Sequence, residues 1–352
     1  MSPREVSQEH GRGANSTVKP APKAQVLITP ETSTNPLYAV REACRQVAAA
    51  AAHVQINAVN LSSYALTLKA VGIPPATTDP PDTYIGTPED VVAYALTLDA
   101  INFGSGYSPQ LERPRDASLY FTVASALRRR FEVHGGFSAD DLIGLTVSDC
   151  STLFDLPMEA KARQELTEAF CLALAELGAF VKKDFDGRFV NLVLSAARSA
   201  AHLVGTLTQM PRFNDVAVYR GLEIPFYKRA QLAVADLSIR LRHHSYGQFD
   251  DLDNLTAFAD NAVPHVLRTH GVLMYDRDLA SRIDAGVLLP AGSEEEVEIR
   301  ACSVEAIERT VALLKVDGRQ INSLAVDSYL WHRAHDPQYR LRARHLTRTA
   351  FY

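Results

Sequence analysis

The chain has 352 residues, of which 47% are hydrophobic and 22% are charged, with 18 glycines and 18 prolines. This composition is typical of a globular protein. A chain of this size can bury a core large enough to be stable without a disulfide or a bound metal. Collagen-like, disordered and mini-protein classes are therefore excluded. Acidic residues (41) outnumber basic ones (36), for a formal net charge of -5. Proteins that hold polynucleotides by charge normally carry a basic excess, so a small-molecule partner is favoured and no stable nucleic-acid binding is expected.

The chain start and the cysteines indicate the compartment. Residues 1–30 are polar and lack the apolar stretch of a secretory signal, so a disordered tail is expected there. No run of about 18 apolar residues that could span a bilayer follows. The four cysteines (Cys44, Cys150, Cys171 and Cys302) are far apart, without the spacing of a zinc site. We expect reduced core thiols in a monomeric, cytoplasmic protein that does not enter a membrane.

The hydrophobic pattern of the first half is helical. One helix is expected to begin at Thr87, with Thr87 as the capping residue and Pro88 in the first turn, and to end near Leu98. Two short helical turns are expected within 137–154. The other helices expected in this half cover residues 36–54, 57–71, 117–132, 158–180 and 188–210.

The second half continues the helical pattern after a brief extended piece, Val216–Tyr219. A helix that ends near Arg242 follows, then short helices up to Ala285. Ser293 and Glu296 have the spacing of a capping box, which opens a helix that Ser303 restarts toward Leu314; residues 320–335 form the last strong helix. The expected fold is mostly α with a few short strands. Residues 31–352 are expected to form one domain, split into two helical lobes with the site between them.

Most familiar catalytic and cofactor motifs are missing. The chain has no GxxxxGK[ST], HExxH or GxSxG motif, and the sequence at residues 104–106, Gly-Ser-Gly, is too short for a dinucleotide fingerprint. A tight turn accounts for it, because glycine adopts positive φ freely. The pairs His243/His244 and His265/His270 lack the spacing of a helical metal site and are interpreted as solvated or core histidines. Neither a metal nor a cofactor is expected.

The segment around Asp260 is more informative. Pro264 follows Asp260 closely, and proline is favoured in the first turn of a helix, so Asp260 is expected at or just before a helix N-terminus. Unpaired N–H groups and the helix dipole favour an ionised carboxylate there. Such a carboxylate in an apolar pocket stabilises a developing cation. The alternative is that Asp260 only caps the helix, and the pattern alone leaves both interpretations open.

Two further stretches combine charge with aromatic residues. Phe226-Tyr227-Lys228-Arg229 sets two cations beside two aromatics at the head of an apolar helix, and Asp327 lies on the same helix as Trp331, the single tryptophan of the chain. A ligand site accounts for both stretches. The first is also compatible with long side chains that lie along an apolar surface, and the second with ordinary core packing.

Taken together, seven stretches make the chain resemble the queuosine salvage protein family, the queuosine 5′-phosphate N-glycosylases/hydrolases. They follow the family order over residues 36–352. The matching stretches are Ile101–Tyr107, Asn214–Tyr219, Ile224–Gln231 with Ala235-Asp236, Phe258–Asp260 with Pro264, Gly292–Cys302, Asp327–Trp331 and Thr347–Tyr352. The resemblance implies a compact helical fold similar to that of helix-hairpin-helix DNA glycosylases, with a catalytic aspartate at a helix N-terminus.

The resemblance also implies site residues. The catalytic aspartate corresponds to Asp260, and its neighbours Phe258 and Ala259 to the wall of the ligand pocket. The C-terminal ligand-binding helix supplies three further positions, which here are Asp327, Ser328 and His332.

The implied reaction is hydrolysis of the bond between ribose and queuine, a 7-deazaguanine, which releases ribose 5-phosphate. Because a carbon replaces the ring nitrogen that assists purine departure, catalysis must stabilise the oxocarbenium-like sugar, as a fixed carboxylate does. Asp327 is the candidate partner for the amine of the base. Lys228, Arg344 and Arg348 are available for the 5′-phosphate.

Two alternatives stay open beside this function. One is a glycosylase that acts on DNA or RNA, which fold analogy alone suggests and the net acidity disfavours. The other is a non-catalytic helical protein that binds queuosine or another nucleotide. Polynucleotide binding with a steep salt dependence would favour the first alternative, whereas saturable ligand binding without release of free base would indicate the second.

Overall fold

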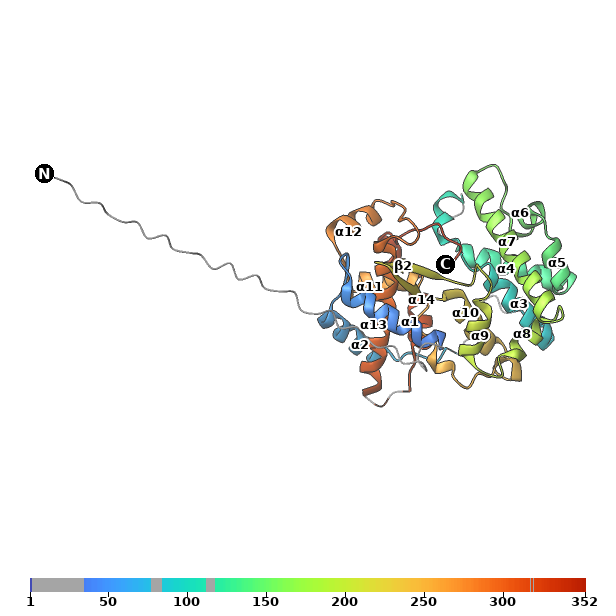
Figure 1. Cartoon of the computed structure of the whole chain (residues 1–352), viewed down its shortest axis with the longest axis horizontal. Coiled ribbons are helices and arrows are strands. Elements are labelled where there is room, and N and C mark those ends of the chain that lie inside the picture. Colours follow the sequence, from blue (N-terminus) through green and yellow to red (C-terminus); the bar gives the residue numbers. More distant parts are fainter. Residues whose placement is uncertain (2–34, 77–83, 112–117, 317, 319) are drawn as a thin grey trace.

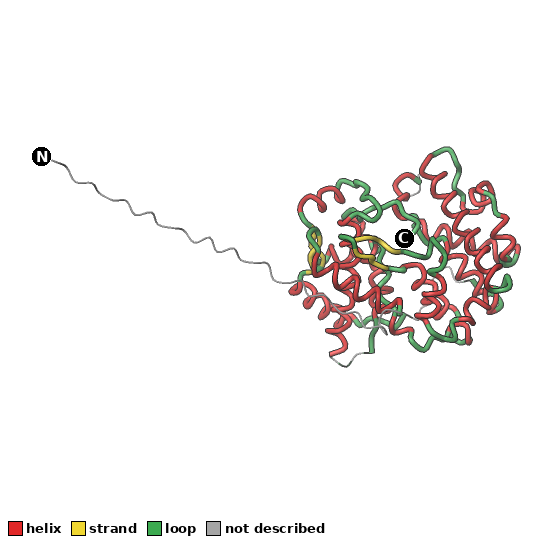
Figure 2. The backbone as a smooth tube through the Cα atoms, in the orientation of Figure 1, coloured by secondary structure: helices red, strands yellow, loops and turns green. Residues whose placement is uncertain are grey.

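The computed structural model describes residues 1, 35–76, 84–111, 118–316, 318 and 320–352, so all but the first residue of the predicted polar tail lies outside the described part. Within this part the chain is mostly helical with a few short strands, as the sequence predicts (Figure 2). None of the helices in these ranges is long and apolar enough to cross a bilayer.

The first half of the chain contains a short strand and a series of helices. These are α1 (Pro36–Ala50), β1 (Val54–Ile56), α2 (Ala58–Val71), α3 (Pro88–Ala100), η1 (Ser105–Gln110), α4 (Leu119–His134), α5 (Ala139–Gly144), α6 (Val147–Phe154), α7 (Lys161–Asp184), α8 (Phe189–Ser195) and α9 (Ala200–Leu207). Thr87 caps α3 as predicted, since its side chain accepts a hydrogen bond from the Asp90 N–H. Local sequence therefore sets the start of this helix.

The second half begins with a hairpin and ends in an irregular segment. Its elements are β2 (Val216–Tyr219), β3 (Leu222–Pro225), α10 (Lys228–Arg240), η2 (Ser245–Gly247), η3 (Leu252–Asn254), α11 (Ala262–Thr269), β4 (Leu273–Tyr275), α12 (Arg277–Asp284), α13 (Glu294–Val316), α14 (Ser323–Arg333) and η4 (Pro337–Leu341). The strands form two antiparallel pairs, β2 with β3 and β1 with β4, and the latter places Val54 opposite Tyr275. The second pair joins segments more than 200 residues apart.

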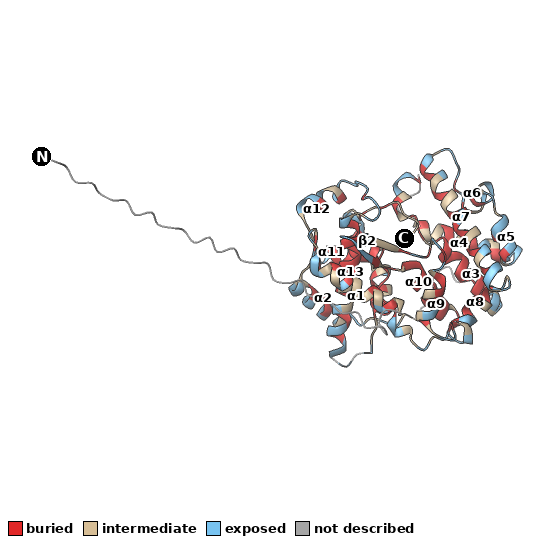
Figure 3. Cartoon of the chain, viewed as in Figure 1, coloured by how far each residue is buried: buried red, intermediate tan, exposed pale blue. Residues whose placement is uncertain are grey.

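Buried apolar side chains form two clusters in opposite halves of the molecule (Figures 1 and 3). One cluster is built mainly on α3, α4 and α6–α10, and the other on α1, α2 and α11–α14. Helix α10 is buried on most of its length, with Ala230, Ala233, Val234 and Leu237 in the first cluster. Its first residue, Lys228, follows Phe226 of the second cluster, so the start of α10 lies where the chain passes from one cluster to the other.

Two predicted helices are shorter than the hydrophobic pattern indicates. The helix predicted for residues 36–54 ends at Ala50, and the backbone N–H groups of residues 52–54 donate to the Glu298 carboxylate instead of continuing the helix. The helix predicted for 188–210 is two helices, α8 and α9. Ala197 and Arg198 between them adopt positive φ (48° and 67°), and Ser199 caps α9. Neither break has a glycine or proline to mark it.

The helix that contains Ser303 is longer than predicted, and its start near Ser293 is capped differently. The Ser293 hydroxyl accepts a hydrogen bond from the Glu296 N–H (3.4 Å), but the Glu296 carboxylate accepts from the Gly292 N–H, so the capping box is half formed. Helix α13 runs unbroken through Ser303, whose hydroxyl donates to the Arg300 carbonyl oxygen at 2.8 Å. The predicted restart at Ser303 is therefore wrong, because this hydroxyl bonds back into the helix that contains it.

Candidate functional site

Two adjoining cavities lie where α10, α14 and the segment before α11 meet. The first, which we call the larger chamber, has a volume of about 320 Å³, and the second, the smaller chamber, about 100 Å³. Five residues line both chambers: Asn102, Tyr120, Lys228, Asp260 and Trp331. The chambers therefore form one candidate site whose two parts meet at Asp260.

Asp260 lies at the N-terminus of α11 and is only 9% exposed. Its Oδ1 accepts hydrogen bonds from the N–H groups of Ala262 (2.8 Å) and Val263 (3.2 Å). These are donors that the first turn of a helix cannot satisfy internally. The sequence left open whether Asp260 caps a helix or belongs to a pocket. The structure combines the two, since one oxygen caps α11 and the residue lines both chambers.

A buried ionic network holds the backbone next to Asp260. The Arg300 guanidinium pairs with Asp215 (2.5 and 3.1 Å), and its Nε donates to the Ala259 carbonyl oxygen at 3.0 Å. Glu296, one turn earlier on α13, lies 3.6 Å from Arg300 and accepts from the Tyr352 hydroxyl at 2.8 Å. The network joins four of the stretches that the sequence singled out and fixes the path of the chain into the site.

The smaller chamber contains most of the predicted ligand residues. Asp327 lines it, and its Oδ1 accepts from the Phe258 N–H at 2.8 Å. Burial raises the pKa of Asp327 well above its usual range, and the nearby Asp260 carboxylate adds to this shift. The predicted site residues that line the smaller chamber are Lys228, Phe258, Asp260, Asp327, Ser328 and His332.

Ala259 is placed differently from its neighbours. It is 2% exposed, belongs to the second apolar cluster, and is not among the residues that line either chamber. Its role in the structure is the bond from its carbonyl oxygen to Arg300. Phe258 and Asp260 line the smaller chamber, whereas Ala259 between them packs in the core.

The cations suggested by the sequence separate into two groups. Lys228 and Arg344 line the larger chamber, whereas Arg348 lies outside both chambers and pairs with Glu165 at 3.1 Å. Arg229 is 1% exposed and donates to backbone carbonyl groups, among them that of Asp99 at 3.3 Å. A position within a matched stretch therefore did not determine whether a cation lines the chambers, since Arg229 and Arg348 lie in such stretches and line neither.

The sequence assigned no site role to some of the residues that line the chambers. Tyr120, from α4, meets Trp331 edge-on with ring centroids 5.6 Å apart at the junction of the chambers. Asp236 lines the smaller chamber and pairs with Arg240 at 3.2 Å. Behind it lies Asp99, whose pKa is raised well above its usual range by burial and by Asp236. Asp236 belongs to one of the matched stretches, Ile224–Gln231 with Ala235-Asp236, whereas Tyr120 and Asp99 belong to none of them.

The C-terminal segment closes one side of the larger chamber. Gly104 donates its N–H to the Tyr352 carbonyl oxygen at 3.1 Å, and the Thr347 carbonyl oxygen lies against Gly106 so closely that a Cβ there would approach it to 2.1 Å. The Leu289 N–H donates to the Leu346 carbonyl oxygen at 2.8 Å. The segment is thus tied to both halves of the molecule, and glycine at position 106 is required for its close approach.

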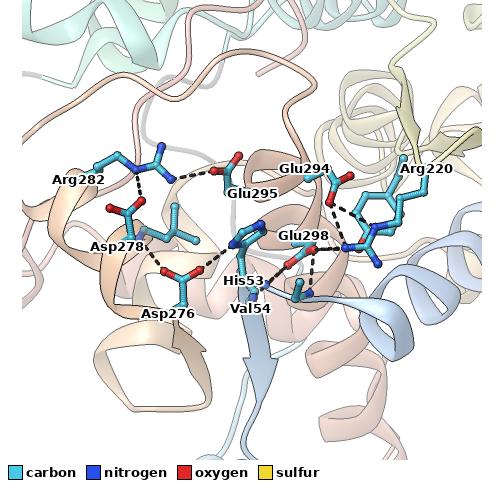
Figure 4. A network of polar contacts seen from close by, with 12 residues as sticks. His53, Val54, Arg220, Asp276, Asp278, Arg282, Glu294, Glu295 and Glu298 are labelled. Atoms are coloured by element: carbon cyan, nitrogen blue, oxygen red, sulfur yellow. Dashed lines mark hydrogen bonds and ion pairs between the residues drawn. The ribbon is translucent and has the colours of Figure 1, made fainter.

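A second polar cluster lies away from the chambers. His53, Glu294 and Glu298 each place one possible metal-ligand atom within 4.8 Å of the others (Figure 4). The Glu298 carboxylate already accepts from the N–H groups of residues 52–54, and Glu294 pairs with Arg220 at 3.0 Å. These contacts join the end of α1 to α13, and none of the cluster residues lines either chamber.

Comparison with known proteins identifies the family. The model of the family described as "Queuosine salvage protein" matches residues 83–352. A protein of Sphaerobacter thermophilus named queuosine 5′-phosphate N-glycosylase/hydrolase is 37% identical over 273 residues, which cover 75% of this chain and 82% of the relative. Proteins of the same name from Dictyostelium discoideum (33% identical; 74% and 77% covered) and Bos taurus (31%; 71% and 78%) are also similar. This chain therefore belongs to the queuosine salvage protein family.

Proposed function

We propose that this chain hydrolyses the N-glycosidic bond of queuosine 5′-phosphate and releases queuine for reuse in tRNA modification. The observation that carries the proposal is the placement of Asp260, a buried carboxylate at a helix N-terminus where two chambers of different lining meet. The activity in the names of the relatives, at 31–37% identity over most of both chains, agrees with this chemistry.

The reaction follows from the position of one carboxylate. As the bond between C1′ of the ribose and N9 of the base lengthens, positive charge develops on the sugar, and the Asp260 carboxylate stabilises it. Water then adds its hydroxyl to C1′, and its proton ends on N9 of the departing queuine. The products are ribose 5-phosphate and queuine. The two N–H donors on Oδ1 hold the Asp260 carboxylate in place throughout.

The smaller chamber suits the base. Queuine carries a secondary amine that is protonated near neutral pH, and the Asp327 carboxylate is placed to meet that cation. Phe258 supplies an aromatic wall, and Ser328 and His332 add polar groups from α14. Lys228 lines both chambers, and Ala259 supports the wall from behind, since its carbonyl oxygen accepts a hydrogen bond from Arg300.

The proposal extends to the architecture and the setting of the enzyme. We take residues 31–352 as one catalytic domain whose site lies between two helical lobes, a fold related to helix-hairpin-helix DNA glycosylases. The two separate apolar clusters support the lobes. All four cysteines are buried and free, as expected of a reduced compartment, and we place the protein in the cytoplasm as a monomer.

The test is to incubate the purified chain with queuosine 5′-phosphate and to follow free queuine and ribose 5-phosphate by chromatography. Equal amounts of both products are expected. Saturable binding without release of base would instead show a non-catalytic binding protein. Base release from DNA or RNA, with a steep salt dependence, would show a polynucleotide glycosylase.

A further inference from the structure

Helix α11 and the residue before it carry three polar side chains on one face. Asn261, His265 and Arg268 follow one another at intervals of four and three residues, which places them on the same side of a helix. All three are at most 6% exposed. Burial of polar side chains is costly unless their hydrogen-bonding groups find partners, so this face of α11 must be met by acceptors.

The acceptors are backbone carbonyl groups of the C-terminal segment. The pairs of donor and acceptor residues are Asn261 with His345 (3.3 Å), His265 with Tyr339 (2.7 Å) and Arg268 with Ala343 (3.5 Å). After Leu341 this segment contains neither a helix nor a strand. Three side chains of one helix therefore hold a stretch of chain that has little regular structure of its own.

Both sides of this contact belong to the candidate site. Asp260 precedes α11 directly, and its carboxylate caps the first turn of the helix. On the other side, Arg340, Arg344 and Leu346 of the C-terminal segment line the larger chamber. The bonds from α11 to the segment therefore set the distance between the Asp260 carboxylate and this part of the chamber wall.

His265 makes the shortest of the three contacts. A carbonyl oxygen only accepts hydrogen bonds, so the Nε2 atom of His265 carries the hydrogen. Its Nδ1 atom is buried and has no hydrogen-bond partner among the described residues. Burial lowers the pKa of His265 to about 4, and the nearby cations Arg344, Arg268 and Arg342 contribute, so the ring is neutral near pH 7. His265 lines neither chamber and can affect the site only through the segment that it holds.

We propose that His265 is a positioning residue for the reaction. Its Nε2–H group, together with Asn261 and Arg268, ties the C-terminal segment to α11 and keeps the chamber wall at a fixed distance from the Asp260 carboxylate. The catalytic consequence rests on the proposed function, whereas the tie itself is a property of the fold. A displacement of about 1 Å in a site of this kind lowers the rate by up to about 10²-fold.

The test compares His265→Gln with His265→Asn. The amide nitrogen of glutamine takes about the position of Nε2 and can donate to the Tyr339 carbonyl oxygen, whereas that of asparagine reaches only the position of Nδ1. His265→Gln is expected to keep kcat/KM for queuosine 5′-phosphate within about threefold of wild type, and His265→Asn to lower it by about tenfold to hundredfold. Thr269→Val is the matched control with wild-type activity, since the Thr269 hydroxyl donates within α11, to the His265 carbonyl oxygen at 2.9 Å.

Amide hydrogen exchange measures the tie without turnover. In His265→Asn the amides of residues 339–346 should exchange about tenfold faster than in wild type, because local opening of the segment no longer breaks this hydrogen bond. The amides of α3, which belongs to the other apolar cluster, should exchange at the wild-type rate. His265→Gln and Thr269→Val should show wild-type exchange in both regions.

Equal behaviour of His265→Gln and His265→Asn would overturn the proposal, because the Nε2–H donor would then have no effect of its own. Faster exchange in α3 and in residues 339–346 alike would also overturn it, since that is a general loss of stability. If neither His265 variant folds, Asn261→Ala decides, because it removes the bond to His345: unchanged exchange of residues 339–346 would contradict the tie, and faster exchange confined to them would support it. If wild type released no queuine, the proposed function would fail, while selective exchange in His265→Asn would still establish the tie.

Discussion

Arg300 donates from Nε to the carbonyl oxygen of Ala259 at 3.0 Å, one residue before Asp260. The same guanidinium pairs with Asp215, and both side chains are at most 3% exposed. Burial of charges carries a desolvation cost that offsets much of their attraction, so such a network contributes little net stability while it is intact. The network instead fixes the position of the backbone next to Asp260, which lies at the junction of the chambers.

Arg300→Met is expected to destabilise the fold by about 3–5 kcal/mol, because it leaves buried carboxylates without their cation. Urea unfolding followed by circular dichroism measures the change. Arg309→Met is the matched control on the same helix, since Arg309 forms a half-exposed pair with Glu305 (2.7 Å) and should cost at most about 1 kcal/mol. Equal effects of the two variants would contradict the role of the buried network.

Asp260→Asn is expected to retain the fold and to lose turnover by about 10²-fold or more, because the amide keeps the cap of α11 but carries no charge for the transition state. Asp276→Asn is a matched control, since Asp276 caps α12, another short helix, through the Leu279 N–H at 2.8 Å. Queuine release and the thermal midpoint are measured for both. Near-normal turnover by folded Asp260→Asn would remove this residue from the chemistry.

Affinity for queuosine 5′-phosphate is expected to fall as the pH falls through the raised pKa of Asp327. Burial and the nearby Asp260 hold Asp327 protonated over a wider range than usual, while Lys228 opposes this shift. A cationic ligand binds the ionised form, so the neutral form at low pH binds it less well. The comparison is with Asp327→Asn, which should bind more weakly and lose this part of the pH dependence.

The same titration with guanosine 5′-phosphate, which lacks the amine, should show little effect of Asp327→Asn. Equal weakening of both nucleotides would mean that Asp327 acts only on the pocket wall.

Gly106→Ala is expected to displace the C-terminal segment, because a Cβ at this position would approach the Thr347 carbonyl oxygen to 2.1 Å. Overpacking of this kind costs about 1–3 kcal/mol, and a shift of a chamber wall by an ångström lowers kcat/KM by up to about 10²-fold. Gly144→Ala is the control, since a Cβ there meets nothing within 4 Å. Unfolding and queuine release are measured for both variants. Wild-type values in Gly106→Ala would show that the segment yields without affecting the site.

The sequence by itself determined most of the helices and the position of Asp260 relative to α11. Helix starts such as Thr87 and the proline after Asp260 depend on hydrogen bonds and backbone angles within a few residues, and local sequence encodes these directly. The order of seven short stretches was also enough to predict the family, which the comparisons confirm. The roles of the individual site residues stay predictions.

Only the tertiary structure determines which charged groups contact one another or line the same chamber. The Glu298 carboxylate ends α1 from the opposite end of the chain, and Arg344 reaches the larger chamber while Arg348, four residues on, pairs with Glu165. Electrostatic attraction and burial depend on distance through space, and folding brings together residues that lie hundreds of positions apart. No local pattern carries that distance, so the set of side chains that lines each chamber became visible only once the helices had packed.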